Sequence, residues 1–358
     1  MRIAYFHTGT ILTSWHFYSL AATMRSLGHE VLDASIPTDR NGAVVHQLGR
    51  AEYQRVVAEL PTLQDLQNCD VIMVAGPEYV IVWLNTLYGN AWRNLRARKV
   101  AFYLESSKRE DVQFPYERFA NGFDLHFFPD PDDAERFGGH HFTWYADTDM
   151  FKPCSHEGEE GHLCDRACEE RRLQEKKYSA AFVGSLYPKR VQFLSKFLPL
   201  IPEIDFRANG VMVRDLGGER PRLAAELLAE NLRQIKIHVG LASNNSMMMV
   251  PRPFETMACG TFLLTYRTKD NPFRDGEHCR VYDPEKPEEL AEMIRYYLVH
   301  EEERERIARA GCAEVRRNYS MKTRIAQILD FAARGVIQTD SRPNASLAGH
   351  GVEASVGA

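Results

Sequence analysis

Short runs of apolar residues alternate along the chain with longer stretches in which apolar residues recur every three or four positions. The first example is an apolar run at residues 2–6, a helical face with Phe17, Leu20 and Met24, and a second run after Gly28. A strand, a helix and another strand in this order are typical of a βαβ unit, in which the two strands are parallel. The opening pattern therefore predicts an α/β fold with a parallel sheet.

The same alternation continues in two parts of the chain. In the first part it predicts three further strands, at residues 71–76, 99–105 and 125–130. In the second part the predicted strands are at residues 180–186, 204–210, 236–242 and 261–267. One predicted helix begins near Pro188, and others cover residues 221–232, 253–259, 288–299, 302–318 and 321–334. We therefore expect two facing α/β domains with a deep cleft between them, and ligands of such sheets bind beyond the carboxyl ends of the strands.

Polar segments mark the expected boundaries of these domains. The first domain is predicted to span residues 1–153 and the second residues 178–335. Between them, residues 154–177 are charged and poor in apolar side chains, which indicates a polar linker or insertion. Residues 336–358 are rich in Gly, Ala, Ser and Asn without an apolar period, so we expect a disordered tail.

Composition narrows the class of protein. The 358 residues are 44% hydrophobic and 26% charged, as in soluble globular proteins, and no run approaches the ~20 apolar residues of a membrane span. The net charge of -5 argues against a surface that binds nucleic acid along its whole length. The N-terminus has the pattern of a folded domain rather than of a signal peptide. Seven cysteines without a secretion signal predict reduced thiols and a cytoplasmic location.

Two predicted helix starts in the second part carry cations. Gly184 ends a strand and allows close backbone approach, and the helix after it starts with Lys189 and Arg190. Cations at a helix start are unfavourable for the helix itself, so their position indicates an anionic partner, although two solvated surface cations are an equally good interpretation. At the second start, Arg252 offers a planar donor fork that fits a diphosphate.

Glu255 follows Arg252 closely and has two interpretations. In the first turn of a helix at residues 253–259, its negative charge would simply stabilise the helix dipole. Alternatively, its carboxylate accepts two hydrogen bonds from the vicinal hydroxyls of a ribose. Two helix N-termini that could each bind an anion, in one domain, suggest a nucleotide diphosphate as the ligand.

The motifs FVGSLYPKR, RPFETMACGTFLLTYR and FRDGEHCRVY occur in this order, followed by the helical stretches EELAEMIRYYL and ERERIARAGC. Together they resemble the C-terminal domain of group 1 glycosyltransferases. The most similar branch is the spore-maturation (CgeB-like) family, which has an Arg-x-Phe-Glu before a Cys-Gly and an apolar strand. Its Ala-Asp-x-x-x-Phe-x-Pro junction is matched in the first domain by Ala146, Asp147, Phe151 and Pro153.

The resemblance implies a GT-B fold of two facing Rossmann-like domains. The second domain would hold a nucleotide-sugar donor, and the helix at residues 321–334 would cross back to the first. Glu255 would bind the ribose, the cations would neutralise the diphosphate, and the 243–246 loop would approach the donor through backbone N–H groups. The residues that would hold the donor are Gly184, Ser185, Lys189, Arg190, Asn244, Asn245, Ser246, Arg252 and Glu255. Many members have a further Glu beside the donor sugar, where this chain has Met247.

The resemblance also implies a transferase that retains anomeric configuration. We expect no obligatory metal ion or other cofactor, because preorganised cations and a helix end can stabilise the leaving diphosphate. Acceptor activation would come from His7, Glu78 or Glu105, which follow strand ends in the first domain. Each has a structural alternative: His7 as a loop cap, Glu78 as a solvated side chain, and Glu105 as an ion-pair partner of Lys108 or Arg109.

A group of potential metal ligands lies in the predicted linker. Zinc would accept four of these five side chains, which are Cys154, His156, His162, Cys164 and Cys168. Their spacing matches no common structural zinc site, so a solvated insertion with reduced thiols is the favoured interpretation.

The sequence as a whole predicts an enzyme that moves a sugar from a nucleotide diphosphate donor to an acceptor that no residue identifies. One alternative is an epimerase or hydrolase that uses nucleotide-sugars on the same architecture. Another is a catalytically inactive nucleotide-sugar-binding scaffold, which Met247 favours. A NAD-dependent dehydrogenase is disfavoured, because the loop HTGTILTSWH lacks the G-x-G-x-x-G spacing.

Overall fold

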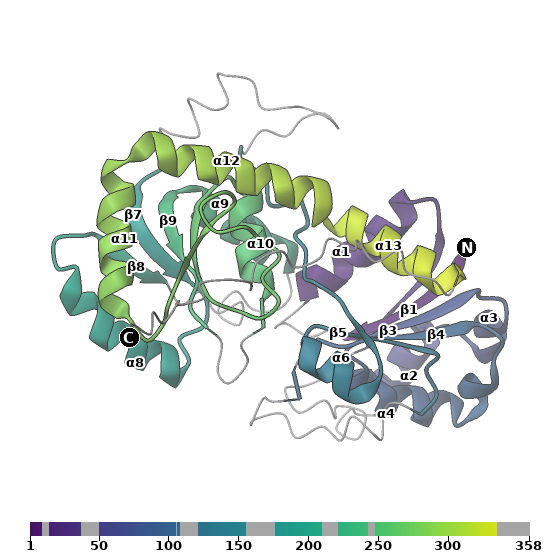
Figure 1. The fold of residues 1–358 in the computed structure, drawn as a ribbon. Helices are drawn as coiled ribbons and strands as arrows, with labels where there is room; N and C mark the ends of the chain where they lie inside the picture. The colour runs from purple at the N-terminus through teal and green to yellow at the C-terminus, as the bar shows by residue number, and fades with distance from the viewer. Residues whose placement is uncertain are drawn as a thin grey trace, which may run out of the picture.

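The computed structural model forms two α/β domains, each built on a parallel sheet (Figure 1). The residues that the structure describes are 1–8, 14–36, 50–104, 106–107, 121–154, 176–209, 221–242 and 248–334. Within these ranges, no helix is both long and apolar enough to cross a membrane.

The first domain has a six-stranded sheet in the order β2-β1-β3-β4-β5-β6. Its strands are β1 (Arg2–Thr8), β2 (Glu30–Ile36), β3 (Val71–Ala75), β4 (Arg98–Phe102), β5 (Leu125–Phe128) and β6 (His140–His141). All neighbouring strands pair in parallel, as predicted from the sequence. Only the two-residue strand β6 has no counterpart in the predicted pattern, because two histidines carry no apolar period.

Both faces of this sheet are buried, which explains why its strands are nearly continuous apolar runs. Ile3 and Tyr5 belong to one core cluster, whereas Ala4 and Phe6 belong to another. The helices of this domain are α1 (Ser14–Ser26), α2 (Arg50–Glu59), α3 (Leu63–Gln67), α4 (Pro77–Tyr88), the short 3-10 helix η2 (Ala91–Asn94) and α6 (Pro131–Phe137). Gly28 follows α1 with φ 83°, a left-handed conformation that glycine adopts readily at a helix end.

The second domain has a five-stranded parallel sheet in the order β11-β10-β9-β7-β8. Its strands are β7 (Tyr178–Val183), β8 (Phe206–Asn209), β9 (Ile235–Val239), β10 (Phe262–Tyr266) and β11 (Arg280–Tyr282). The chain order reverses between β7 and β9, which makes the carboxyl ends of these two strands the expected ligand position of an open α/β sheet.

The α-helices of the second domain start within one residue of the predicted positions, except for α10. They are α8 (Pro188–Phe197), the 3-10 helix η3 (Leu198–Leu200), α9 (Pro221–Arg233), α10 (Pro251–Ala258), α11 (Pro287–Val299), α12 (Glu301–Asn318) and α13 (Met321–Arg334). Helix α10 begins two residues earlier than expected, because Pro251 takes the first helical position, where a missing N–H costs nothing. Glu255 is therefore outside the first turn, and its interpretation as a first-turn partner of the helix dipole is wrong.

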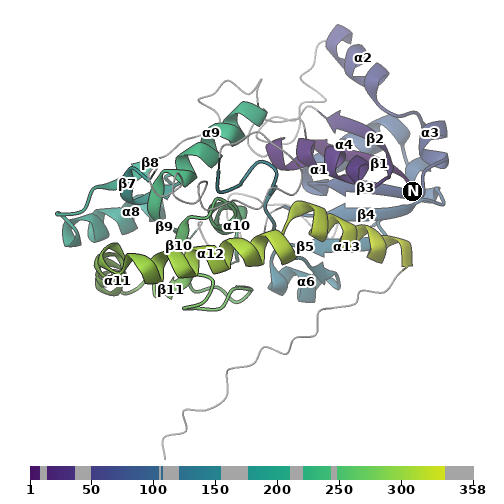
Figure 2. The same ribbon diagram turned by 90° about the horizontal axis from the view of Figure 1, so that it is seen from above.

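The C-terminal helix α13 returns to the first domain. It lies beside α1 in both views (Figures 1 and 2) and contacts it. Arg98 Nη1 of β4 donates to the Ala332 carbonyl at 2.7 Å, and the Phe331 ring lies 4.6 Å from the His140 ring. One core cluster continues from the first sheet through α13 to α9 and α10, so the two domains share part of their apolar core.

Candidate functional site

Helix α10 places an acidic and a basic side chain together near the carboxyl edge of the second sheet. Glu255 is almost fully buried, with 1% of its side chain exposed, and its Oε2 lies 2.6 Å from Nη1 of Arg252, which is 22% exposed. A buried carboxylate requires a compensating charge, and Arg252 supplies it. The acid in turn offsets the unfavourable position of a cation in the first helical turn. The guanidinium of Arg252 is therefore partly exposed to solvent, whereas the carboxylate of Glu255 beside it is buried.

A neutral histidine lies beneath this pair. His238 of β9 is fully buried; its Nε2 accepts the Val183 backbone N–H at 3.3 Å, and its Nδ1 lies 3.3 Å from Oγ1 of Thr256. Since Nε2 accepts, the network assigns the proton to Nδ1, which donates to Thr256. Burial, followed by the positive charge of Arg252, lowers the pKa of His238 from 6.5 to about 3. His238 was not among the predicted site residues, although a histidine inside the apolar run IKIHVG is a recognisable signal.

Arg190 joins the two strand ends at which the sheet order reverses. Its Nη1 donates to the Ser185 carbonyl at 2.8 Å, after β7. Its Nη2 and Nε donate to the carbonyls of Leu241 and Ala242 at 3.0 and 2.9 Å, after β9. The side chain was predicted to bind the diphosphate, but the structure directs these three donor atoms to backbone carbonyls. Arg190 shapes the candidate site, and its contact with phosphate stays a prediction.

The other predicted donor residues surround these loops or lie outside the described part of the chain. Lys189 is exposed in the first turn of α8. A Cβ on Gly184 would lie 2.9 Å from Cζ of Phe182, so packing inside the domain already favours glycine there. The four residues Asn244, Asn245, Ser246 and Met247 lie outside the described residues.

Two side chains hold the backbone that leads into α10: Tyr266, the last residue of β10, and Asp270, which follows this strand. The Tyr266 hydroxyl donates to the Met248 carbonyl at 3.1 Å. The Met249 amide donates to both carboxylate oxygens of Asp270, each at 2.9 Å. Sequence reasoning missed both residues, because their partners lie about twenty positions away and no local motif marks them.

In the first domain, His7 is fully buried at the carboxyl end of β1. Its Nε2 lies 3.0 Å from Oδ1 of Asp33 on the neighbouring strand β2, and its ring stacks on Tyr5 with centroids 4.9 Å apart. An imidazole held by a carboxylate is a suitable general base. Of the other predicted candidates, Glu78 lies in the first turn of α4 but its side chain is not described, and Glu105 lies outside the described residues.

Of the five predicted metal ligands, only Cys154 belongs to the described part of the chain. His156, His162, Cys164 and Cys168 lie outside it. Among the residues that the structure describes, no three histidine, cysteine or acidic side chains are grouped as a metal site. Zinc binding by the linker stays an untested alternative.

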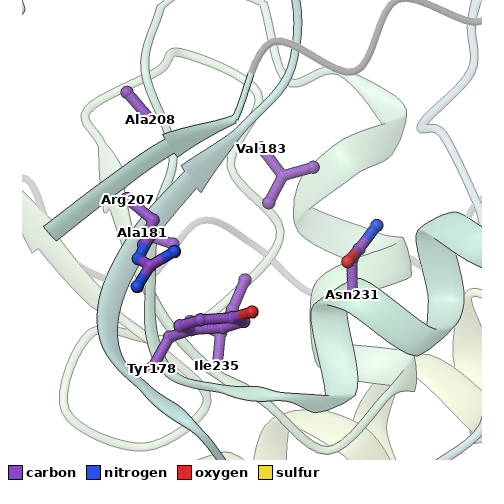
Figure 3. Close-up of a pocket in the computed structure, with 7 residues that line it drawn as sticks. All are labelled: Tyr178, Ala181, Val183, Arg207, Ala208, Asn231 and Ile235. Carbon is purple, nitrogen blue, oxygen red and sulfur yellow. The ribbon is translucent and has the colours of Figure 1, made fainter.

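A cavity of about 180 Å³ lies in the second domain between β7, β8 and α9 (Figure 3). The Arg207 guanidinium lies over the Tyr178 ring at 4.8 Å, and Asn231 of α9 lies across from them. The residues that line it are Tyr178, Ala181, Val183, Arg207, Ala208, Asn231 and Ile235. None of the side chains predicted to bind the donor lines this cavity.

Part of the sequence is similar to a known protein family. Residues 189–330 match a protein-family model described as glycosyl transferase-like. No curated protein matches the sequence significantly. The match covers α8 to α13, the part of the chain that contains Lys189, Arg252 and Glu255.

Several solved structures share the whole two-domain arrangement. Anabaena Alr3699/HepE in complex with UDP has a TM-score of 0.58 and 14% identity, over 92% of this chain and 99% of that one. Sucrose-phosphate synthase (tll1590) from Thermosynechococcus elongatus has a TM-score of 0.59 and 12% identity, over 92% and 98%. An alpha-glucosyltransferase in complex with UDP and a 13-mer DNA has a TM-score of 0.59 and 12% identity, over 93% and 99%. The chain therefore has the GT-B fold of two Rossmann-like domains, and residues 189–330 are similar to the glycosyl transferase-like family.

Proposed function

We propose that the protein is a glycosyltransferase that moves a sugar from a nucleoside diphosphate donor to an acceptor hydroxyl. The observation that carries this proposal is the Arg252–Glu255 pair, a guanidinium over a carboxylate with 1% exposure, on a helix at the carboxyl edge of the second sheet. The match of residues 189–330 to a glycosyl transferase-like model supports it, as do structural neighbours solved with UDP or UDP-glucose.

Each member of the pair has a role in donor binding. Arg252 has five N–H donors, so it can bind phosphate oxygens while it still pairs with Glu255. Glu255 accepts hydrogen bonds from the ribose hydroxyls, and Lys189 at the start of α8 adds a second positive charge. Cations and helix starts then stabilise the leaving diphosphate without a divalent ion. In this proposal the reaction retains anomeric configuration, and the RPFE and CG motifs favour the CgeB-like branch.

The first domain supplies the group that activates the acceptor. His7, oriented by Asp33 at 3.0 Å, removes the proton of the acceptor hydroxyl as the sugar is transferred. The sugar, the nucleobase and the acceptor are open in this proposal. A second candidate is an inactive nucleotide-sugar-binding protein, which Met247 favours because many group 1 glycosyltransferases have a glutamate beside the donor sugar at that position.

Binding of UDP and UDP-glucose, measured by calorimetry, tests the donor site. We expect the wild-type chain to bind both, and Glu255→Gln to weaken UDP binding about tenfold, or ~1.4 kcal/mol, because the amide accepts fewer hydrogen bonds from the ribose. Glu289→Gln is the matched control, since Glu289 is an exposed first-turn glutamate of α11 in the same domain, and it should bind UDP normally.

One outcome would contradict both candidates, and another would separate them. A panel of UDP, ADP, GDP and their glucose conjugates that leaves the melting temperature unchanged contradicts nucleotide-sugar binding altogether, because a ligand of the native state raises it by mass action. Binding without release of UDP from UDP-glucose, in the presence of a mixed acceptor pool, favours the inactive scaffold.

A further inference from the structure

Asp270, in the segment after β10, contacts both domains at once. Its side chain is 2% exposed, and both carboxylate oxygens accept the Met249 amide at 2.9 Å. From the first domain, Nε2 of His141 on β6 lies 3.8 Å from Oδ2 of the same carboxylate. One buried acid therefore links the first domain to the backbone that leads into α10.

A second ion pair, next to the Asp270 contact, also connects the two domains. Nζ of Lys269 lies 3.1 Å from Oδ2 of Asp132, in the first turn of α6. These two side chains are 72% and 36% exposed, so water screens the pair and it contributes little to stability. Of these two polar contacts, the buried Asp270 contact is the one that connects the first domain to the start of α10.

Asp270 holds a backbone amide that lies close to the residues of the candidate site. Met249 lies three residues before Arg252 and six before Glu255, and the Tyr266 hydroxyl holds the preceding Met248 carbonyl at 3.1 Å. Tyr266 at the end of β10 and Asp270 after it thus both hold the backbone before α10, and the first domain contacts the carboxylate of Asp270. A change in the orientation of that carboxylate moves the Met249 amide and the first turn of α10.

We propose that Asp270 is a positioning residue that couples the packing of the two domains to the start of α10. When the first domain packs against the second, His141 orients the carboxylate, and the carboxylate holds Met249. Separation of the domains removes His141 and loosens the turn that carries Arg252. The consequence for donor binding rests on the proposed function, whereas the coupling itself does not.

Amide hydrogen exchange of the full chain tests the coupling without any nucleotide. The measurement follows the peptide that covers residues 248–258. We expect His141→Leu and Asp270→Asn each to increase its exchange rate about tenfold. His29→Leu is the matched control, because His29 is a partly exposed histidine of the first domain whose Nδ1 contacts the N-terminal amine instead, and it should leave this peptide unchanged. Wild-type exchange in His141→Leu would overturn the proposal.

Donor binding gives a second readout that a purely structural role would not change. We expect His141→Leu to raise the Kd of UDP and the KM of UDP-glucose about tenfold while kcat changes less than about twofold, as for a loss of uniform binding. A lower melting temperature with unchanged Kd and KM means that His141 only stabilises the fold, and the positioning role is then wrong. If the wild-type chain binds no nucleotide, the proposed function fails, and the exchange experiment still decides the coupling.

Discussion

Replacement of Arg190 distinguishes a residue that shapes the loops from one that binds phosphate. The side chain is 8% exposed and donates to the carbonyls of Ser185, Leu241 and Ala242. Burial lowers the pKa of its guanidinium, which reflects the cost of taking the charge out of water. In Arg190→Met the carbonyls lose their donors, whereas Arg190→Lys keeps the charge but concentrates its donors on one atom that cannot reach all three.

The expected loss of stability follows from these contacts. A hydrogen bond to a charged group contributes about 1.5–3 kcal/mol net, and three such bonds set an upper limit of about 9 kcal/mol. The actual loss of stability is smaller than this limit for two reasons. Methionine has no charge to bury, and water can hydrate the carbonyl of Ser185, which is partly exposed. We expect Arg190→Met to lower the free energy of unfolding by about 3 kcal/mol, and Arg190→Lys by an intermediate amount.

Urea denaturation followed by far-ultraviolet circular dichroism, in the absence of nucleotide, measures this loss. Lys189→Met is the matched control, because the neighbouring cation is exposed and its replacement should change stability by less than about 0.5 kcal/mol. If Arg190→Met and Lys189→Met are equally stable but only the first loses UDP binding, Arg190 is a phosphate ligand and its role in shaping the loops is refuted.

Two further predictions concern the histidines. Below pH 6.5 the unfolded chain protonates His238, whereas the folded chain does so only near pH 3, so stability falls as the pH is lowered between these values. We expect a loss of about 2 kcal/mol from pH 7 to pH 5 that is absent in His238→Gln; equal pH dependence of the two proteins would show that this site is not responsible. We also expect His7→Asn to lower kcat by about 100-fold or more with little effect on the Kd of UDP, since His7 belongs to the acceptor side; undiminished turnover would exclude it as the base.

The secondary structure was largely readable from the sequence because the rules that produce it are local. Strands buried on both faces require consecutive apolar residues, as in β3 and β10, and helices that cover them require apolar residues on one face. Gly28 after α1 marked a helix end through its own backbone preference. The short strands β6 and β11 were not predicted, because two or three residues contain too little of a pattern.

The candidate site was only partly readable. The motif around Glu255 identified the correct helix, but the helix starts two residues earlier at Pro251, which removed the simplest structural explanation of that glutamate. Asp33 was missed as the partner of His7, because the two side chains are neighbours only once β2 pairs with β1.

By itself, the sequence determined the order of strands and helices, the division into two α/β domains, and the presence of acidic and basic residues at particular helix starts. The tertiary structure decided which of these residues meet. It turned Arg190 toward the ends of β7 and β9, placed the neutral His238 beneath Arg252, and brought His141 of one domain to Asp270 of the other. The physical reason is that burial, charge compensation and hydrogen-bond partners depend on the order of strands in a sheet and on the packing of domains, neither of which has a local signature in the chain.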